Sequence, residues 1–416
     1  MNTANLRVLF VCHYYPPHLG GIENVVRHEA VGLAEQGAHV TVVTSGKQSS
    51  TTTQDGVTVV RIAAWNGAER HLGVPFPLFS PRLLPAMMGW ARWADVVHVH
   101  DSLYMTSWAA LAATARTTTP YLLTQHIGLV QHPSPLVRGV QRAIYATAGR
   151  LLVRRARRVF TLNASVAKLT ARLGARAENS VHLPNGVHTD LFRPAVSPAE
   201  RRLARSYFGL PPDRPLALFA GRLVPKKGYA LLLEARRADP DPRYDLVFAG
   251  EGGGSAALVG RSGVHFLGPL PPTLLAEAYR ACDMFALPSR AEGFPLTVQE
   301  AMASGLAVLT TDDPGYAPYR LDARQARLLP RTAPAWTRAL AELAADPRTR
   351  RLMSIEARRY ALAEFGWPAH LSALLHAYRA VLPAPAGQHH STGAQTGTAP
   401  NTHEGPDGAQ KEHGSS

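Results

Sequence analysis

An α/β protein with two facing, Rossmann-like, doubly wound domains is the fold class that the sequence predicts. Short apolar runs alternate with segments of helical periodicity in both halves of the chain, which is typical of parallel sheets covered by helices. A proline-rich stretch separates the two halves. The 416 residues also exceed the roughly 250 to 300 at which single hydrophobic cores stop growing. A hydrophobic content of 46% with 18% charged residues excludes a chain that is disordered throughout.

The amino-terminal half opens with a strand, a glycine-containing loop, a helix and a second strand. Residues 6–12 form a largely apolar run, and Gly20 and Gly21 follow in an irregular loop. Apolar residues recur at helical spacing over 22–33, and residues 39–44 return to a strand pattern, which completes a βαβ unit. Further strands are expected at residues 57–62, 96–100, 121–124 and 158–162.

The carboxy-terminal half repeats this scheme after a break. Between residues 185 and 215, Pro-Asn-Gly, Ser-Pro and Pro-Pro sequences predict a linker. The expected elements that follow are a strand at 216–220, a loop at 221–228, a helix at 229–237, a strand at 245–250 and strands near His265 and Met284.

These elements predict a division into four parts. We expect one α/β domain over residues 1–195 and a second over residues 196–366. A helix over 367–382 is expected to cross back to the first domain. Residues 383–416 contain almost no large apolar side chain and are predicted to form a disordered tail.

Positive charge is concentrated in one segment. The chain carries a formal net charge of +14, and no acidic residue lies between Asp101 and Glu178. Residues 136–159 mix apolar side chains with arginines, a composition that favours anionic membrane surfaces, although a plain solvated face is the alternative. The arginines of this segment are Arg138, Arg142, Arg150, Arg154, Arg155, Arg157 and Arg158.

Cysteine usage and hydropathy indicate the compartment. Two cysteines, Cys12 and Cys282, provide neither a disulfide framework nor a four-ligand zinc cluster, which fits a reducing compartment. No stretch reaches the roughly 18 apolar residues that a membrane span requires. We therefore expect a cytoplasmic protein with peripheral contact to the inner face of the cell membrane.

Two glutamates eight positions apart mark the sharpest motif. Pro295 suits the first turn of a helix that runs to about Ser304, so Glu292 lies on the loop before the helix and Glu300 about a turn and a half inside it. The amides near Phe294 then point outward at the positive end of the helix dipole and form an anion site between the two carboxylates. The alternative is a solvated helix with two exposed glutamates.

A glycine-bounded basic loop supports the first interpretation. Arg222 and Lys227 lie just beyond a predicted strand end, where a guanidinium fork and an ammonium can bind a diphosphate and stabilise a leaving group. The pair Gly20 and Gly21 would let backbone approach an anion closely. An ordinary surface loop and a plain tight turn are the alternatives for these two segments.

Five motifs together resemble one family. They are Tyr-Pro-Pro-x-x-Gly-Gly-Ile-Glu at 15–23, Asp-Val-Val-His-Val-His at 95–100, Leu-Pro-Asn-Gly-Val-His-Thr-Asp-Leu-Phe-Arg-Pro at 183–194, Gly-Arg-Leu-x-x-x-Lys-Gly at 221–228 and the paired-glutamate segment at 292–305. Over residues 6–380 the chain resembles the retaining nucleotide-sugar glycosyltransferases of glycosyltransferase family 4, which have the two-domain B-type glycosyltransferase fold. This resemblance implies the same fold here.

The resemblance also assigns expected roles. Glu292 would contact the transferred sugar, Glu300 the ribose hydroxyls, and Arg222 with Lys227 the diphosphate, while His126 would face the donor sugar. Without the family, a histidine at a strand end is more simply a structural residue. The complete donor set is Gly20, Gly21, Arg222, Lys227, Glu292, Gly293, Phe294, Pro295, Leu296 and Glu300.

The resemblance implies an amino-terminal acceptor-binding domain over residues 1–195 and a carboxy-terminal nucleotide-sugar-binding domain over residues 196–366. The function that it implies is retaining transfer of a hexose-type sugar from a nucleoside-diphosphate sugar to an acceptor hydroxyl. The basic segment over residues 136–159 favours a lipid-linked, cell-envelope or polysaccharide acceptor. The nucleotide sugar is a co-substrate, and no other cofactor is expected. No essential metal is expected either, because the one candidate pair of aspartates, Asp239 and Asp241, lies in a proline-rich turn away from the motifs. Nucleic acid is not an expected partner, since the basic segment lacks a recognition motif or an aromatic stacking platform. The alternatives are a catalytically inactive sugar-nucleotide binding or scaffold protein, and a nucleotide-sugar epimerase.

Overall fold

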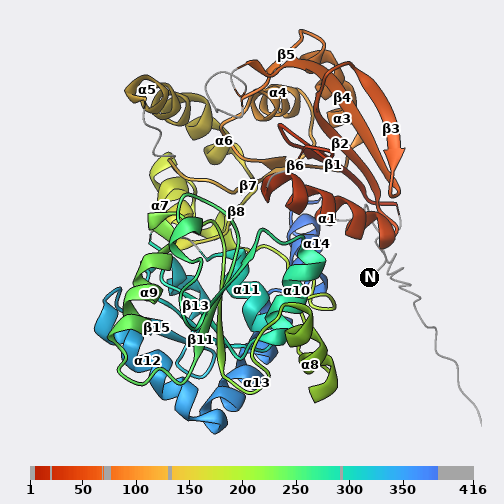
Figure 1. The fold of residues 1–416 in the computed structure, drawn as a ribbon. Helices are drawn as coiled ribbons and strands as arrows, with labels where there is room; N and C mark the ends of the chain where they lie inside the picture. Colours follow the sequence, from red (N-terminus) through yellow and green to blue (C-terminus); the bar gives the residue numbers. More distant parts are fainter. Residues whose placement is uncertain are drawn as a thin grey trace, which may run out of the picture. The chain divides into compact units, whose positions relative to one another are not determined.

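The structure, a computed structural model, describes residues 5–18, 21–67, 69, 76–129, 134–290 and 294–382. The predicted disordered tail at 383–416 lies outside the described residues. Within the described part of the chain, two separate sheets form, one from each half of the sequence, and helices cover them (Figure 1). The prediction of two Rossmann-like, doubly wound α/β units is confirmed.

The first sheet has the strand order β3-β4-β2-β1-β6-β7-β8-β9 among the described residues. From β4 to β9 every neighbouring pair is parallel. These parallel strands are β1 (Arg7–Val11), β2 (His39–Gly46), β4 (Val57–Trp65), β6 (Val96–His100), β7 (Tyr121–Gln125), β8 (Arg158–Thr161) and β9 (Ser180–His182). Strand β1 lies between β2 and β6, so the chain winds in one direction from β1 and in the other from β6.

Two antiparallel strands extend this sheet at one edge. Strand β3 (Ser50–Gln54) and the two-residue strand β5 (Leu78–Phe79) both pair with β4. The sequence predicts neither strand. Strand β3 reads Ser-Thr-Thr-Thr-Gln and is exposed along its length, so it lacks the apolar run on which the strand predictions rest. Strand β5 has only two residues, which is too short for a pattern to be visible. An exposed, threonine-rich edge strand needs no hydrophobic partner.

Helices cover both faces of the first sheet. They are α1 (Gly21–Glu35), α3 (Leu83–Trp93), α4 (Met105–Thr114), α5 (Pro135–Ile144), α6 (Arg150–Arg155) and α7 (Ala164–Leu173). Strand side chains alternate between the faces: Leu9 and Val97 pack with α3 and α4, whereas Phe10 and Val96 pack with α1. This period of two places the two histidines of β6, His98 and His100, on the α1 face.

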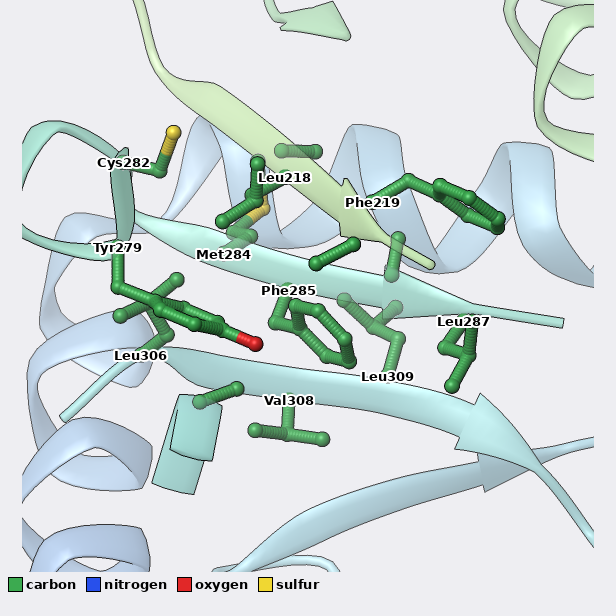
Figure 2. Packing of buried hydrophobic residues seen from close by; sticks show 14 of the residues in the cluster. Leu218, Phe219, Tyr279, Cys282, Met284, Phe285, Leu287, Leu306, Val308 and Leu309 are labelled. Carbon is green, nitrogen blue, oxygen red and sulfur yellow. The ribbon is translucent and has the colours of Figure 1, made fainter. Parts of the chain in front are cut away.

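The second sheet is parallel throughout, in the order β12-β11-β10-β13-β14-β15. Its strands are β10 (Leu216–Ala220), β11 (Asp245–Ala249), β12 (Val264–Gly268), β13 (Met284–Leu287), β14 (Ala307–Thr311) and β15 (Ala326–Leu329). Figure 2 shows the apolar packing at its centre, where Leu218, Phe285 and Leu309 come from three neighbouring strands. All three are fully buried, which explains why each strand reads as a continuous apolar run.

The helices of the second half are α8 (Pro198–Tyr207), α9 (Tyr229–Ala238), α10 (Pro272–Ala281), α11 (Leu296–Ala303), α12 (Ala333–Ala345), α13 (Pro347–Glu364) and α14 (Trp367–Arg379). The last of them packs against the first sheet rather than the second. Leu371, Leu374 and Tyr378 of α14 join the cluster that contains Phe10 and α1, and α14 lies beside α1 in Figure 1. The end of the described chain therefore contributes side chains to the core of the first half.

Candidate functional site

The reversal of winding direction in the second sheet defines the first candidate site. Strands β10 and β13 are neighbours, and the chain proceeds from β10 toward β12 and from β13 toward β15. Open α/β sheets bind ligands at the carboxyl ends of the two strands where the direction reverses. The loop after β10 carries Arg222 and Lys227, and the segment after β13 leads into α11. The sheet therefore brings the predicted basic loop and the predicted helix terminus to one edge.

Close backbone contacts fix the loop on both sides of Arg222. A Cβ atom on Gly250 would lie 2.1 Å from the Gly221 carbonyl oxygen, so only glycine permits this approach. The amide of Leu223 donates to the Glu251 carbonyl at 2.8 Å. Arg222 itself is exposed. A held backbone with an exposed guanidinium suits a residue that binds a ligand.

Lys227 closes this loop. It is the last residue of a short 3-10 turn, Pro225–Lys227, and its side chain is half-buried. The next residue, Gly228, approaches the segment after β13 so closely that a Cβ atom there would lie 2.1 Å from the Pro288 carbonyl oxygen. The amide of Arg290 donates to the Lys226 carbonyl at 2.9 Å. The two loops are therefore in direct contact.

Arg331, which the sequence did not single out, ties the same two loops together. Its Nε donates to the Pro288 carbonyl at 2.8 Å and its Nη2 to the Pro225 carbonyl at 3.1 Å. Arg331 follows β15, 43 positions after Pro288 and 106 after Pro225, and no local motif marks it. Only the folded arrangement reveals this connection.

The amino terminus of α11 is the second part of this site. The helix begins at Leu296 with Pro295 as the preceding cap residue, and among the residues that the structure describes no side chain caps the first amides. The predicted helix over roughly 295–304 is thus present with its first turn shifted by one residue. The buried ring of Phe294 stacks on Tyr319 with ring centroids 4.0 Å apart, which anchors the chain where the helix starts. The helix amides at this end carry partial positive charge.

Glu300 is buried within α11 and is not a solvated side chain. Only 7% of the residue is exposed, and its Oε2 accepts a hydrogen bond from the Tyr279 hydroxyl at 3.1 Å. Burial raises the pKa of Glu300 to about 7, against the opposing effect of the Tyr279 hydrogen bond. The alternative of two exposed glutamates on a solvated helix is wrong for Glu300. A buried carboxylate of this kind requires hydrogen-bond donors when it is charged.

Three predicted donor residues, Gly20, Glu292 and Gly293, lie outside the described residues. Gly21 is the first residue of α1, the helix that follows β1. Of the predicted donor residues, the structure therefore describes Gly21, Arg222, Lys227, Phe294, Pro295, Leu296 and Glu300.

His126 follows β7 directly, at the carboxyl end of the first sheet. It is half-buried, and its Nε2 lies 2.9 Å from His100 Nδ1, with the two rings stacked at an interplanar angle of 22°. Burial lowers the pKa of His126 to about 3. The ring is therefore neutral at physiological pH, and its hydrogen bonding depends on which nitrogen carries the proton.

Asp101 holds the segment that carries His126. It lies at the end of β6 with φ of 70°, a left-handed conformation that is uncommon outside glycine. Its carboxyl group accepts from Gln125 Nε2 at 2.7 Å and from the Ile127 amide at 3.2 Å, on both sides of His126. Burial raises the pKa of Asp101 to about 7. The sequence did not indicate this role.

A cluster of buried polar side chains lies behind His126. Glu29 of α1, His98 and His100 of β6 and His370 of α14 are all nearly or fully buried. Ligand atoms of Glu29, His98 and His100 lie within 4.8 Å of one another, the spacing of a possible metal-binding group. The available signal was His98-x-His100 on a predicted strand, because residues two apart share a face.

Comparisons with known proteins agree with this architecture. Residues 20–186 match the family described as Glycosyl transferase 4-like domain, and residues 200–360 match Glycosyl transferases group 1. A D-inositol 3-phosphate glycosyltransferase from Xylanimonas cellulosilytica is 30% identical over 392 residues, which span 86% of this chain and 91% of that protein.

Solved structures show the same fold. The sucrose-phosphate synthase of Thermosynechococcus elongatus superposes with a TM-score of 0.71 at 21% identity, over 90% of this chain and 99% of that one. HepE from Anabaena, solved in complex with UDP, superposes with a TM-score of 0.68 at 18% identity, over 90% of this chain and 100% of that one. At these identities the likeness concerns the fold.

Proposed function

The chain belongs to family 4 of the glycosyltransferases, which transfer a sugar from a nucleotide sugar, and from this premise we propose that it moves a hexose-type sugar to an acceptor hydroxyl with retention of anomeric configuration. One observation supports this most directly. The basic loop after β10 and the amino terminus of α11, where no side chain of the described residues caps the first amides, both lie at the edge where the second sheet reverses direction. That combination of cations and helix amides suits a diphosphate.

The proposed donor site has a role for each part. Arg222 presents a planar fork and Lys227 a point charge to the diphosphate, while the first amides of α11 share its negative charge. Glu300 accepts hydrogen bonds from the ribose hydroxyls, and Glu292 contacts the transferred sugar. UDP is the first nucleotide to test, because HepE was solved with UDP bound.

The proposed chemistry needs no nucleophile from the protein. The acceptor attacks the face from which the diphosphate departs, and a phosphate oxygen takes the acceptor proton. Arg222, Lys227 and the helix amides stabilise the charge that develops on the leaving group. Neutral His126 hydrogen-bonds the donor sugar. We propose that no metal ion is required.

We propose that the two halves of the chain bind different substrates. Residues 1–195 would form an acceptor domain and residues 196–366 a donor domain, and closure of the two would exclude water from the reaction. The helix over 367–382 would join the acceptor domain, and the packing of α14 against α1 supports this assignment.

The acceptor is proposed to be lipid-linked or part of the cell envelope, reached at the cytoplasmic face of the membrane. Helix α5 supports this, because Leu136 is 75% exposed and Val140 is 51% exposed on a helix that also carries Arg138 and Arg142. A helix with exposed apolar residues on one side and arginines on another suits an anionic lipid surface. No helix in the described parts of the chain has the length and apolar character needed to cross a bilayer.

The segment 136–159 does not form a single basic surface. Leu152 and Val153 are buried in α6, and Arg158 opens β8, where its Nη1 donates to Asn179 Oδ1 at 3.0 Å. The proposed membrane contact is therefore confined to α5 and the exposed side of α6.

Release of nucleoside diphosphate tests the proposed function. UDP-glucose is incubated with the protein alone, with vesicles that contain a polyprenyl-phosphate-linked sugar, and with inositol phosphate, the acceptor class in the name of the curated relative. We expect UDP release with one of the two acceptors and a product with the donor's anomeric configuration. The donor series is then repeated with ADP-, GDP- and TDP-sugars.

The alternatives give different results. If the protein only binds the nucleotide sugar, the sugar raises its melting temperature, but no diphosphate is released with any acceptor. An epimerase converts the donor sugar when no acceptor is present. Either result would replace the proposed transferase.

A further inference from the structure

Four buried polar side chains connect α14 to His126. Glu29, His98 and His100 are fully buried, and His370 is 4% exposed. Burying a carboxylate and several imidazoles is costly unless their protons and lone pairs are matched. The position of each proton in this cluster can therefore be derived from its partners.

Both ring nitrogens of His370 have a partner. Its Nδ1 lies 2.8 Å from the Pro184 carbonyl oxygen, which can only accept, so Nδ1 carries a proton. Its Nε2 lies 2.8 Å from Glu29 Oε1. One proton must lie between these two atoms, either on His370 or on Glu29. The pair as a whole therefore carries no net charge.

The second oxygen of Glu29 faces His100. Glu29 Oε2 lies 3.4 Å from His100 Nε2, and neither atom has a hydrogen-bond partner among the described residues. Burial lowers the pKa of His100 well below its usual range, so the ring is neutral and has one N–H. The adjacent carboxylate oxygen favours placing that hydrogen on Nε2.

The proton on Nε2 determines what His100 offers to His126. With Nε2 protonated, His100 Nδ1 has a lone pair and accepts from His126 Nε2, which lies 2.9 Å away. The ring of His126 then carries its hydrogen on Nε2. Its Nδ1 is left as a hydrogen-bond acceptor.

We propose that Glu29 and His100 are positioning residues that fix His126 as the Nε2-protonated tautomer and so make its Nδ1 an acceptor for a hydroxyl donor. The identity of that donor as a hydroxyl of the nucleotide sugar rests on the proposed function. The tautomer itself follows from the contacts of the free protein.

The hydrogen bonds of His98 argue against a metal ion in this cluster. Its Nδ1 lies 2.7 Å from the Tyr378 hydroxyl and its Nε2 2.7 Å from Thr124 Oγ1, so both ring nitrogens are engaged in hydrogen bonds. A metal ion bound by Glu29, His98 and His100 would have to break one of them. The contacts of these side chains therefore suit a set of neutral, hydrogen-bonding groups better than the ligands of a metal ion.

Nitrogen-15 NMR of histidine-labelled, full-length protein tests the proposal without any nucleotide. A His126→Gln variant assigns the signals of His126 by their loss. We expect a pyrrole-type nitrogen at His126 Nε2 and a pyridine-type nitrogen at Nδ1. The opposite pattern, or a metal ion retained at one equivalent by elemental analysis, would overturn the proposal.

Two substitutions of Glu29 separate positioning from mere filling of space. In Glu29→Gln, the amide nitrogen can donate to His370 Nε2 and the amide oxygen can face His100, so the His126 tautomer is expected to persist. In Glu29→Leu no acceptor remains, and the His126 signals should move toward the average of the two tautomers. An unchanged tautomer in Glu29→Leu would contradict the positioning role.

Matched controls exclude general effects of the substitution. Glu35 is exposed on the same helix, and Glu35→Gln and Glu35→Leu should leave the His126 signals unchanged. If Glu29→Leu does not fold, His100→Phe serves instead, because phenylalanine keeps an aromatic ring beside His126 but offers that ring neither a hydrogen-bond donor nor an acceptor. That variant is also expected to give mixed tautomers, and a single Nε2-protonated tautomer in it would contradict the proposal.

Addition of UDP-glucose then distinguishes the two claims. If the tautomer is as proposed but UDP-glucose and the other nucleotide sugars leave every His126 signal unmoved, the proposed donor contact fails while the positioning role remains.

Discussion

Glu300 is the residue whose environment most clearly departs from what its position in a sequence suggests. A carboxyl group on a helix usually faces water, but this one lies under Tyr279 with its pKa raised to about 7. In the folded protein the group therefore binds a proton between its ordinary pKa, 4.5, and about 7, whereas in the unfolded chain it does not. Folding stability that depends on this proton is lost as the pH rises through that window.

This linkage predicts a pH-dependent effect of Glu300→Gln. Below pH 4.5 the wild type and the variant should have similar free energies of unfolding. Between pH 4.5 and 7 the wild type should lose stability relative to the variant, by up to about 3 kcal/mol in total from a shift of this size. Urea unfolding at several pH values measures the difference.

The control for this prediction is Glu364→Gln, since Glu364 is exposed on α13. A difference between the wild type and Glu300→Gln that does not vary with pH would contradict the raised pKa.

Arg222 and Lys227 are predicted to act on turnover rather than on stability. Each lies on a loop whose backbone is held by contacts that do not involve its side chain. Arg222→Ala and Lys227→Ala should each lower kcat by about 100-fold to 1,000-fold, the range found when one group that stabilises a developing charge is removed. The melting temperature should change little.

Arg243→Ala and Lys47→Ala are matched controls, because both side chains are exposed and lie outside the proposed site. Unchanged turnover in Arg222→Ala and Lys227→Ala would remove the assigned role of these two residues.

The candidate site residues that the sequence predicts are those that belong to local motifs. Arg222, Lys227 and Glu300 each lie in a short segment with a recognisable spacing. Arg331, Asp101 and Glu29 were missed because their roles depend on contacts with segments far away in the sequence. Glu29, for example, meets a histidine 341 positions later. No periodicity or spacing encodes such a pairing.

Arg331 connects the loop after β10 to the loop after β13. The guanidinium of Arg331 bonds one carbonyl in each loop, and a planar fork is suited to two acceptors at once. In Arg331→Ala these bonds are absent, and hydrogen–deuterium exchange of residues 221–228 should increase. We expect the KM for the donor to rise by roughly 2-fold to 10-fold, as the loss of ordinary hydrogen bonds implies, with a smaller change in kcat.

Arg331→Lys should not restore the donor KM, because an ammonium lacks the fixed fork. Full recovery in the lysine variant would show that charge alone, and not the connection of the loops, explains the effect.

Helix α5 makes a separate prediction about membranes. Arg142 and Arg150 are both exposed, at α5 and at the start of α6. Basic residues near an anionic membrane contribute about 1 kcal/mol each. Changing both to Gln should therefore weaken binding to vesicles rich in anionic lipid by about 25-fold, as measured by sedimentation.

The matched control is Arg324→Gln with Arg359→Gln, two exposed arginines elsewhere in the chain. Equal sedimentation with neutral and anionic vesicles in the wild type would rule out the membrane contact.

Most elements followed from apolar periodicity, and the failures have a physical cause. Strands β1, β6, β10 and β13 are buried on both faces, so their apolar runs were visible in the sequence. Strand β3 was invisible because it is polar and exposed. The start of α11 was misplaced by one residue, since proline is compatible with both the cap and the first turn.

For the whole molecule, the repeated alternation of strands and helices was enough to predict two doubly wound sheets. The winding order of each sheet could be predicted only as a class, because the order of strands depends on contacts between distant segments. The packing of α14 with α1 illustrates this, as Tyr378 and His98 lie 280 positions apart in the sequence. The sequence contains the apolar face of α14 but not the identity of its partner.

We propose that the carboxyl edge of the second sheet binds a nucleoside diphosphate through Arg222, Lys227 and the amides of α11. Isothermal titration of the wild-type protein with UDP, ADP, GDP and TDP, each beside its monophosphate, tests this most directly. We expect measurable binding of at least one diphosphate, and at least about tenfold weaker binding of its monophosphate, because charge-assisted bonds to the second phosphate are lost. No heat with any diphosphate, or equal affinity for the diphosphate and the monophosphate, would contradict it.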